Sequence, residues 1–239
     1  MAFTTLNNWF RNHFGRPRAV LILGMHRSDA GFLATALGQS GVCFTPQSGQ
    51  PDAIESPRLI ALNDAVLAES GGSWDQPPEQ VEWSGARLAQ AGELADGFSG
   101  VRIRGLKDPR LLLTLEGWQQ VLPRMQRVGV FRHPLAVARS LHKHCGISDP
   151  DQALRLWLVY NHRLLAEYRR APFPVLCFDQ HWESPDLRAR KVARALGLPG
   201  PRRIACFDSD RVVEQPNQNS VLPPDVQSLH ASLQTIALV

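Results

Sequence analysis

The segment Ala19-Val-Leu-Ile-Leu-Gly24 constrains the fold more than any other part of the sequence. A short, continuous apolar run that ends in glycine is typical of a strand buried on both faces. After a polar loop, residues 32–40 have the pattern of a helix, which Gly41 ends. A buried strand that leads directly into a helix is the basic unit of a sheet covered by helices. We therefore expect an α/β protein.

Short apolar segments and helical segments alternate along the rest of the chain. Strands are expected around residues 42–44 and at 101–106, 127–132 and 174–178, and helices at 55–70, 86–94, 134–143, 149–168 and 184–196. This alternation predicts one parallel sheet with helices on both faces, in a single domain without an internal repeat. Ligands of such sheets bind beyond the carboxyl ends of the strands, so the loops at that edge are the candidates for a functional site.

Charge and cysteine usage exclude several classes of protein. The 26 Lys and Arg residues against 22 Asp and Glu give a net charge of +4 over 239 residues. That excess is too thin for a surface that binds nucleic acid, although it allows a local basic site for a small anion. The four cysteines stand far apart without zinc-ligand spacing, which predicts reduced thiols in a cytoplasmic protein. No apolar run approaches the roughly 20 residues of a membrane helix.

The first 18 residues are expected to form a segment distinct from the domain at 19–239. Five large apolar residues share helical spacing there: Phe3, Leu6, Trp9, Phe10 and Phe14. Arginines lie close to them in the sequence, so the segment has the character of an amphipathic helix. Such a helix either docks on its own domain, which we favour, or makes peripheral contact with a membrane surface or a partner.

The loop between the first strand and the first helix reads Gly24-Met-His-Arg-Ser-Asp-Ala-Gly31. A small-residue loop at a helix N-terminus binds anions, because unpaired N–H groups and the helix dipole face the ligand. A Walker A loop has a glycine five residues after its first glycine, followed by lysine. Asp29 and Ala30 occupy these positions, so the loop is not of the ATP-binding type. Taken alone, it is equally well explained as an ordinary strand–helix turn.

A second motif, Phe131-Arg-His-Pro134, also joins an expected strand to an expected helix. Arg132 lies at the strand end and Ser140 lies two turns into the helix. A guanidinium and a hydroxyl so placed can hold one phosphate group, since arginine supplies planar, paired donors. In isolation these residues would be a surface arginine and a helix serine. The two loops together favour a phosphate site.

These motifs resemble those of sulfotransferases that use 3'-phosphoadenosine-5'-phosphosulfate (PAPS). The resemblance rests on Gly24-Met-His-Arg-Ser28, on Lys107-Asp-Pro-Arg110, and on Phe131-Arg-His-Pro134 followed by Ser140, and it covers roughly residues 19–200. It implies a P-loop-like parallel sheet and PAPS as co-substrate, without a metal. It also implies that the 5'-phosphosulfate is bound by Arg27 and by the N–H groups of Ser28, Asp29, Ala30 and Gly31. Arg132 and Ser140 would bind the 3'-phosphate.

The same resemblance implies roles in sulfuryl transfer. Arg27 and Lys107 would neutralise charge on the leaving phosphate, and Glu55 would take the proton of the acceptor hydroxyl. Glu55 and Lys107 also have a structural explanation: a glutamate at a helix start suits the helix dipole, and Lys107 could be a solvated lysine in the turn before Pro109. His26 and His133 are alternative bases, although His133 is better explained as a helix-start residue.

Four further residues near these motifs are expected to be structural. Asp108 should pair with an arginine such as Arg110, Asp179 should cap or form a turn, and Trp157 and Tyr160 should pack in the core.

The first loop departs from the family at three positions. The family has Gly-Thr-Ser or Gly-Thr-Thr where this chain has Asp29, Ala30 and Gly31, so the backbone loses a glycine and the site loses two hydroxyl donors. A carboxylate about 4 Å from a phosphate charge costs about 1 kcal/mol in water and about 4 kcal/mol at an effective dielectric constant of 20. We expect Asp29 to turn away from the ligand or to pair with Arg27.

Three functions are open at this point. The first is sulfuryl transfer to a hydroxyl of a carbohydrate or small metabolite. The second is a protein that keeps the nucleotide site, binding adenosine bisphosphate or a partner, but has weak or no transfer activity. The third is a P-loop kinase, which would need the Gly-Lys-[Ser/Thr] sequence that this chain lacks. The acceptor pocket is expected within residues 45–100, where no motif occurs.

Overall fold

The computed structural model describes residues 19–45, 54–98, 101–179, 184–201 and 222–238. The expected amphipathic segment at 1–18 lies outside the described residues.

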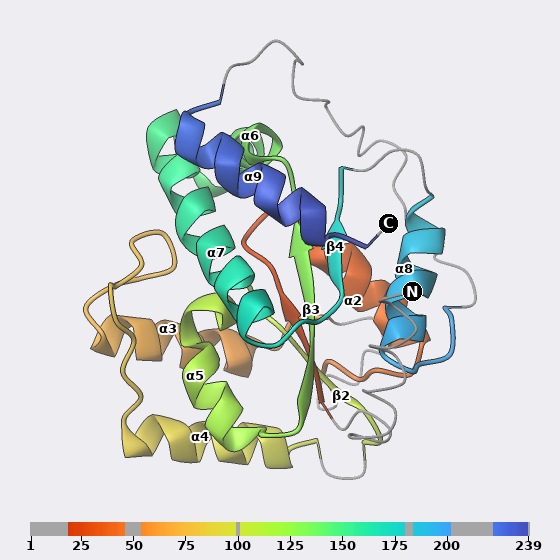
Figure 1. Ribbon diagram of the computed structural model, residues 1–239. Helices are drawn as coiled ribbons and strands as arrows, with labels where there is room; N and C mark the ends of the chain where they lie inside the picture. Colours follow the sequence, from red (N-terminus) through yellow and green to blue (C-terminus); the bar gives the residue numbers. More distant parts are fainter. Residues whose placement is uncertain (1–18, 46–53, 99–100, 180–183, 202–221, 239) are drawn as a thin grey trace.

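Four parallel strands form the sheet, in the order β2-β1-β3-β4 (Figure 1). The strands are β1 (Ala19–Leu23), β2 (Arg104–Lys107), β3 (Met125–Phe131) and β4 (Val175–Cys177). All five residues of β1 are buried, which is typical of a central strand covered on both faces. In the register of β1 with its neighbours, Ile22 pairs with Lys107 and Leu23 pairs with Gly129. The predicted parallel α/β sheet in a single domain is therefore confirmed.

Helices cover both faces of this sheet (Figure 1). One face is covered by α2 (Ala30–Gln39) and α8 (Pro185–Ala195), and the other by α3 (Pro57–Glu69), α4 (Gly85–Asp96), α5 (Leu111–Val121), α6 (Pro134–Cys145), α7 (Pro150–Arg170) and α9 (Pro224–Ile236). Alternate residues of β1 serve the two cores, because successive side chains of a strand point to opposite faces. Val20 and Ile22 pack toward α2 and α8, whereas Leu21 and Leu23 pack into the larger core.

Polar caps fix where several helices begin. The hydroxyls of Ser56, Ser84 and Ser184 accept hydrogen bonds from the N–H three residues further on, at the starts of α3, α4 and α8. The carboxylate of Asp149 accepts from the N–H of Asp151 at the start of α7, as its position before Pro150 predicts. These caps explain why the helix starts expected from the sequence lie within a few residues of the observed ones.

Four expectations about elements were wrong. The strand expected at 42–44 is a single bridge between Cys43 and Arg104, and β2 begins at Arg104 rather than at residue 101. Helices α5 and α9 were not expected. Seven of the eleven residues of α5 are buried, and apart from Thr114 its polar residues Glu116, Gln119 and Gln120 all lie in its second half, so the helical pattern is short. In α9 the sequence signal for a helix is the spacing of Val226, Leu229 and Leu233.

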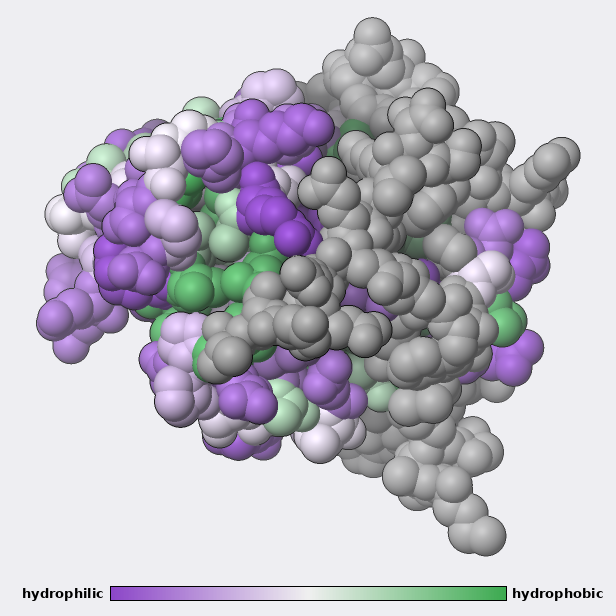
Figure 2. Space-filling view, turned by 90° about the horizontal axis from the view of Figure 1, so that it is seen from above, coloured by the Kyte–Doolittle hydropathy of each residue, from purple (hydrophilic) through white to green (hydrophobic). Residues whose placement is uncertain are grey.

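The described surface is mostly hydrophilic. Seen from above, it shows an apolar area framed by hydrophilic side chains (Figure 2). Of the helices that the structure describes, none is both long enough and apolar enough to cross a membrane.

Candidate functional site

The loop between β1 and α2 is tightly wound. Arg27 and Asp29 both have left-handed backbone conformations, with φ of 65° and 63°. Aspartate tolerates this region better than most residues, whereas for arginine it stores strain. A Cβ at Gly24 would lie 2.7 Å from Ser28 Oγ and 2.7 Å from the carbonyl oxygen of Val130. Glycine is therefore required at position 24, because the loop passes directly over β3 there.

Three of the expected 5' ligands, Ser28, Ala30 and Gly31, lie at the start of α2. Ser28 and Ala30 are buried, and the hydroxyl of Ser28 has no hydrogen-bond partner within the described parts of the chain. The first N–H groups of a helix have no acceptor inside the helix. What this turn offers a ligand is therefore mainly backbone N–H groups.

Arg27 lies against Ser140 of α6. Its guanidinium Nε donates a hydrogen bond to Ser140 Oγ over 2.7 Å. The resemblance placed these two residues at opposite ends of a nucleotide, Arg27 on the 5' side and Ser140 on the 3' side. The structure instead brings them into direct contact.

Arg132, immediately after β3, lies between two carboxylates. Its Nη1 is 3.0 Å from Asp29 Oδ2, and its Nε is 3.3 Å from Asp179 Oδ1. Only 13–14% of each of the three side chains is exposed, so these ion pairs are shielded from solvent. Asp29 was expected to turn away from the ligand or to pair with Arg27, and the structure places its carboxylate on Arg132. Arg27 is engaged by Ser140, and the neighbouring strand β3 supplies a different arginine.

The loop after β3 is held in place by hydrogen bonds to its backbone. Asp179 accepts from the N–H of His133, and Trp157 Nε1 donates to the carbonyl of Arg132 over 2.9 Å. His133 is the N-cap of α6, and its Nδ1 accepts from the N–H of Leu135. Burial lowers the pKa of His133. The expected helix-start role of His133 is confirmed, and Arg132 is presented in a fixed position.

Lys107 and Glu55, two of the expected catalytic residues, form an ion pair. Lys107 is the last residue of β2 and is buried, whereas about half of the Glu55 side chain, 52%, is exposed. Glu55 stands just before the Ser56 cap of α3. The pair therefore joins a buried cation at the sheet edge to a carboxylate that solvent can reach.

Asp108, next to this pair, belongs to a buried structural network. It accepts from Arg110 Nη1 at 3.0 Å and from Asn63 Nδ2 at 2.7 Å. The other amide atom of Asn63, Oδ1, accepts from Thr114 Oγ1 and from Trp118 Nε1. The expected pairing of Asp108 with Arg110 is confirmed. The network fixes the segment that carries Lys107.

His26 is a neutral imidazole among cations. Burial, together with the positive charges of Arg110, Lys107 and Arg27, lowers the pKa of His26 to about 3. Its Nδ1 is buried and has no hydrogen-bond partner among the described residues. A base with this pKa binds a proton weakly at neutral pH, which argues against His26 as the group that removes the acceptor's proton.

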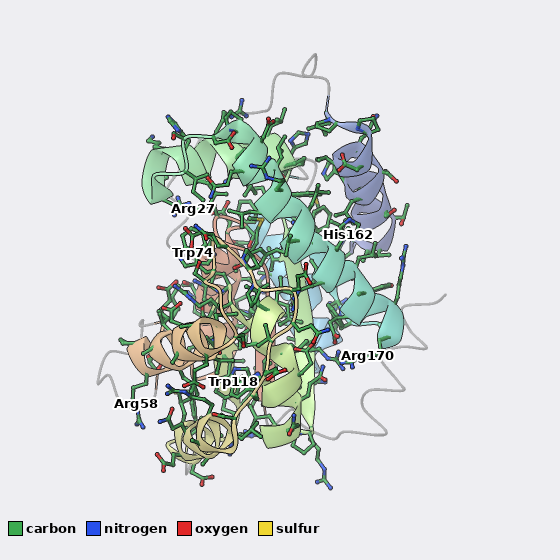
Figure 3. The ribbon with its side chains drawn as sticks, turned by 90° about the vertical axis from the view of Figure 1, so that its left-hand side faces the viewer. Arg27, Arg58, Trp74, Trp118, His162 and Arg170 are labelled. Carbon is green, nitrogen blue, oxygen red and sulfur yellow. The ribbon has the colours of Figure 1, made fainter. Side chains whose placement is uncertain are left out.

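Trp74 is a neighbour of the site that the sequence did not reveal. Its ring centroid lies 4.1 Å from that of His26. Its backbone carbonyl oxygen accepts a hydrogen bond of 2.8 Å from the hydroxyl of Tyr160. Figure 3 shows Trp74 close to Arg27. Trp157 and Tyr160 are fully buried, which confirms the core packing expected for both. Because Trp74 lies in a segment without periodicity or motif, no sequence signal pointed to it.

Three cations that the sequence motifs singled out lie along one edge of the sheet. β2, β1 and β3 are neighbours, so Lys107, the loop with Arg27, and Arg132 follow adjacent strands. We call Arg27, Asp29, Lys107, Arg132 and Ser140 the strand-end site. Among the described residues, no group of three or more His, Cys, Asp or Glu side chains is placed to hold a metal ion.

No protein-family model matches the chain, and no curated protein matches it significantly. Among solved structures, it is similar to a sulfotransferase from Alicyclobacillus acidocaldarius, with 15% identity, a TM-score of 0.47 and 92% of each chain covered. It is also similar to sulfotransferase STF9 from Mycobacterium avium, with 13% identity, a TM-score of 0.48, and 96% of this chain and 80% of that chain covered. A third similar structure is sulfotransferase STF1 from Mycobacterium tuberculosis H37Rv, with 14% identity, a TM-score of 0.45, and 98% and 81% covered.

Proposed function

We propose that this protein transfers a sulfuryl group from PAPS to a hydroxyl of a carbohydrate or small-metabolite acceptor. The observation that carries the proposal is the strand-end site itself. Arg27, Lys107 and Arg132 come from three neighbouring strand ends and converge on the loop at the N-terminus of α2. Cations and helix N–H groups gathered at one edge of a parallel sheet suit a ligand with several anionic groups.

In this proposal, Arg132 and Ser140 bind the 3'-phosphate of the donor. Arg27 and the N–H groups of the first turn of α2 bind the 5'-phosphosulfate. Both arrangements require that a contact between protein side chains is replaced by a contact with the ligand. Ser140 releases Arg27, to which it is hydrogen-bonded, and Arg132 releases Asp29.

The transfer step uses the Lys107–Glu55 pair. The acceptor oxygen forms a bond to sulfur while the bond from sulfur to the bridging phosphate oxygen breaks, and the bond's electron pair stays on that oxygen. Lys107 neutralises the charge that develops there, and Glu55 takes the proton of the acceptor hydroxyl. The exposed carboxylate of Glu55 is open to an acceptor, and buried Lys107 is fixed at the end of β2.

A second candidate function is nucleotide binding without transfer. The observation that favours it is the ion pair of Asp29 with Arg132, which sets a carboxylate against the arginine expected to bind phosphate. The loop also lacks the two hydroxyl donors of the family pattern.

Calorimetry followed by a transfer assay tests both candidates. Adenosine 3',5'-bisphosphate and magnesium-ATP are titrated into the full chain, and sulfuryl transfer from radiolabelled PAPS is measured with a panel of carbohydrate and phenolic acceptors. Micromolar binding of the bisphosphate without metal, together with transfer, is the expected result. Binding without transfer to any acceptor favours the second candidate. Preference for magnesium-ATP would contradict both and favour a kinase.

A further inference from the structure

The groups around Arg132 carry more negative charge than a phosphate-binding site requires. Arg132 contributes +1, and the carboxylates of Asp29 and Asp179 contribute −1 each, so the three groups sum to −1. A phosphate monoester with a charge near −2 therefore meets no net positive charge at this end of the site.

Asp29 occupies the position of an anion on Arg132. The two groups are in contact at 3.0 Å and are largely shielded from solvent, where an ion pair is screened less than at the surface. The backbone supports this placement, because Asp29 is held in the left-handed region as the N-cap of α2, a conformation that aspartate accepts readily. Asp179 is also held, by the N–H of His133, so it does not move away when a ligand arrives.

Carboxylates and arginines bind different substituents of a nucleotide ribose. A carboxylate accepts a hydrogen bond from a free ribose hydroxyl, whereas an arginine accommodates a phosphate on the same carbon. In this chain the Asp29 carboxylate and the Arg132 guanidinium form an ion pair with each other. The combination suits a hydroxyl at least as well as a phosphate.

We propose that Asp29 is a selectivity residue that removes the site's preference for a 3'-phosphate. The donor class then includes adenosine 5'-phosphosulfate with a free 3'-hydroxyl, which donates to the Asp29 carboxylate, as well as PAPS, whose 3'-phosphate must displace that carboxylate from Arg132. The inference rests on the proposed function, since it assumes that an adenine nucleotide binds at the strand-end site.

The test compares two nucleotides that differ only in the 3'-phosphate. Adenosine 5'-monophosphate and adenosine 3',5'-bisphosphate are titrated by calorimetry into the full chain as wild type, as Asp29→Asn and as Asp96→Asn. Asparagine removes the charge but keeps the size and the tolerance of positive φ. Asp96 is exposed at the end of α4, so its variant controls for the change in net charge. Asp29→Gly, which also accepts the observed φ of 63°, is the second variant if Asp29→Asn unfolds.

We expect the wild type to bind the two nucleotides with affinities within about threefold of each other. Asp29→Asn should raise bisphosphate affinity by about tenfold or more and leave monophosphate affinity unchanged, while Asp96→Asn behaves as wild type. A wild type that prefers the bisphosphate by more than about tenfold overturns this inference but leaves the proposed function standing. So does an Asp29→Asn variant that changes both affinities equally. If the wild type binds neither nucleotide, both the proposed function and this inference fail.

Discussion

Arg27 and Ser140, which are 113 residues apart in the chain, are joined by a hydrogen bond of 2.7 Å from the guanidinium Nε to the hydroxyl oxygen. The contact is possible because β1 and β3 are neighbours, so the loop after β1 lies beside the helix that follows β3. It joins the loop after β1 to α6, and so connects the two segments that we propose bind the phosphates of the donor.

We expect Arg132→Ala to lower the affinity for adenosine 3',5'-bisphosphate by at least about tenfold, as measured by calorimetry. The variant leaves Asp29 and Asp179 without the cation that holds them, so two carboxylates would face the incoming phosphate. Arg155→Ala is the matched control, because Arg155 lies on α7 with 65% of its side chain exposed and pairs with Asp149, which is also exposed. An Arg132→Ala protein that folds and binds the bisphosphate as tightly as the control would refute the assignment of Arg132.

Glu55→Gln should lower kcat for sulfuryl transfer by about 10²-fold or more, since the amide cannot accept the acceptor's proton. Affinity for the bisphosphate should not fall, because the carboxylate that is removed pairs with Lys107 and its loss leaves the lysine charge to the phosphate. The matched control is Glu69→Gln. It removes an exposed carboxylate at the end of α3, which forms an ion pair with Arg87 of α4. Equal turnover by the Glu55 variant and the control would exclude Glu55 as the base.

The parallel sheet was predictable because its signals are local. Residues 19–24 and 128–131 are short apolar runs, and Gly41, Gly71 and Gly197 end helices in the left-handed conformation that glycine accepts. The same topology made it possible to expect Arg27, Lys107 and Arg132 at one edge. Helix α5 was not expected because residues 111–115 are apolar except for Thr114, and the polar positions of the helix, Glu116, Gln119 and Gln120, are confined to its second half.

The partners within the site were not predictable, because they depend on contacts between segments distant in the sequence. Asp29 lies two residues from Arg27 but pairs with Arg132, 103 positions further along the chain. Trp74 comes from a segment without periodicity and reaches the site through its contact with His26. The motifs identified residues that lie at the same edge of the sheet. Which of these side chains form ion pairs or hydrogen bonds depends on the three-dimensional geometry.

Gly24→Ala should destabilise the protein by about 1–3 kcal/mol in guanidinium-induced unfolding. The added methyl group would stand 2.7 Å from the carbonyl oxygen of Val130, a backbone atom of β3 that cannot rotate away. Gly38→Ala is the matched control, because a Cβ there meets no atom within 4 Å and position 38 lies inside α2. Alanine in a helix interior should stabilise by about 0.5–1 kcal/mol. Equal unfolding midpoints for the two variants would show that the loop does not depend on the close approach at Gly24.

His230 of α9 should make the protein sensitive to acid. Its ring packs against those of His133, Phe131 and Trp157, with the His133 ring centroid 4.9 Å away. Burial and the neighbouring His133 lower the pKa of His230 to about 4. An unfolded histidine has a pKa near 6.5. Below pH 6.5 the unfolded chain therefore binds a proton that the folded chain does not, and the free energy of unfolding falls as the pH falls toward 4.

His230→Phe should remove this part of the acid sensitivity while keeping an aromatic ring in the same buried position. Between pH 7.5 and pH 5, the wild type should lose about 2 kcal/mol of unfolding free energy through His230 alone, and the variant should not lose this amount. The measurement is guanidinium-induced unfolding at pH 7.5 and pH 5. His162→Phe, at an exposed position of α7, is the matched control and should lose as much stability as the wild type (Figure 3). If His230→Phe loses as much stability between these two pH values as His162→Phe does, His230 is not the group that weakens the fold in acid.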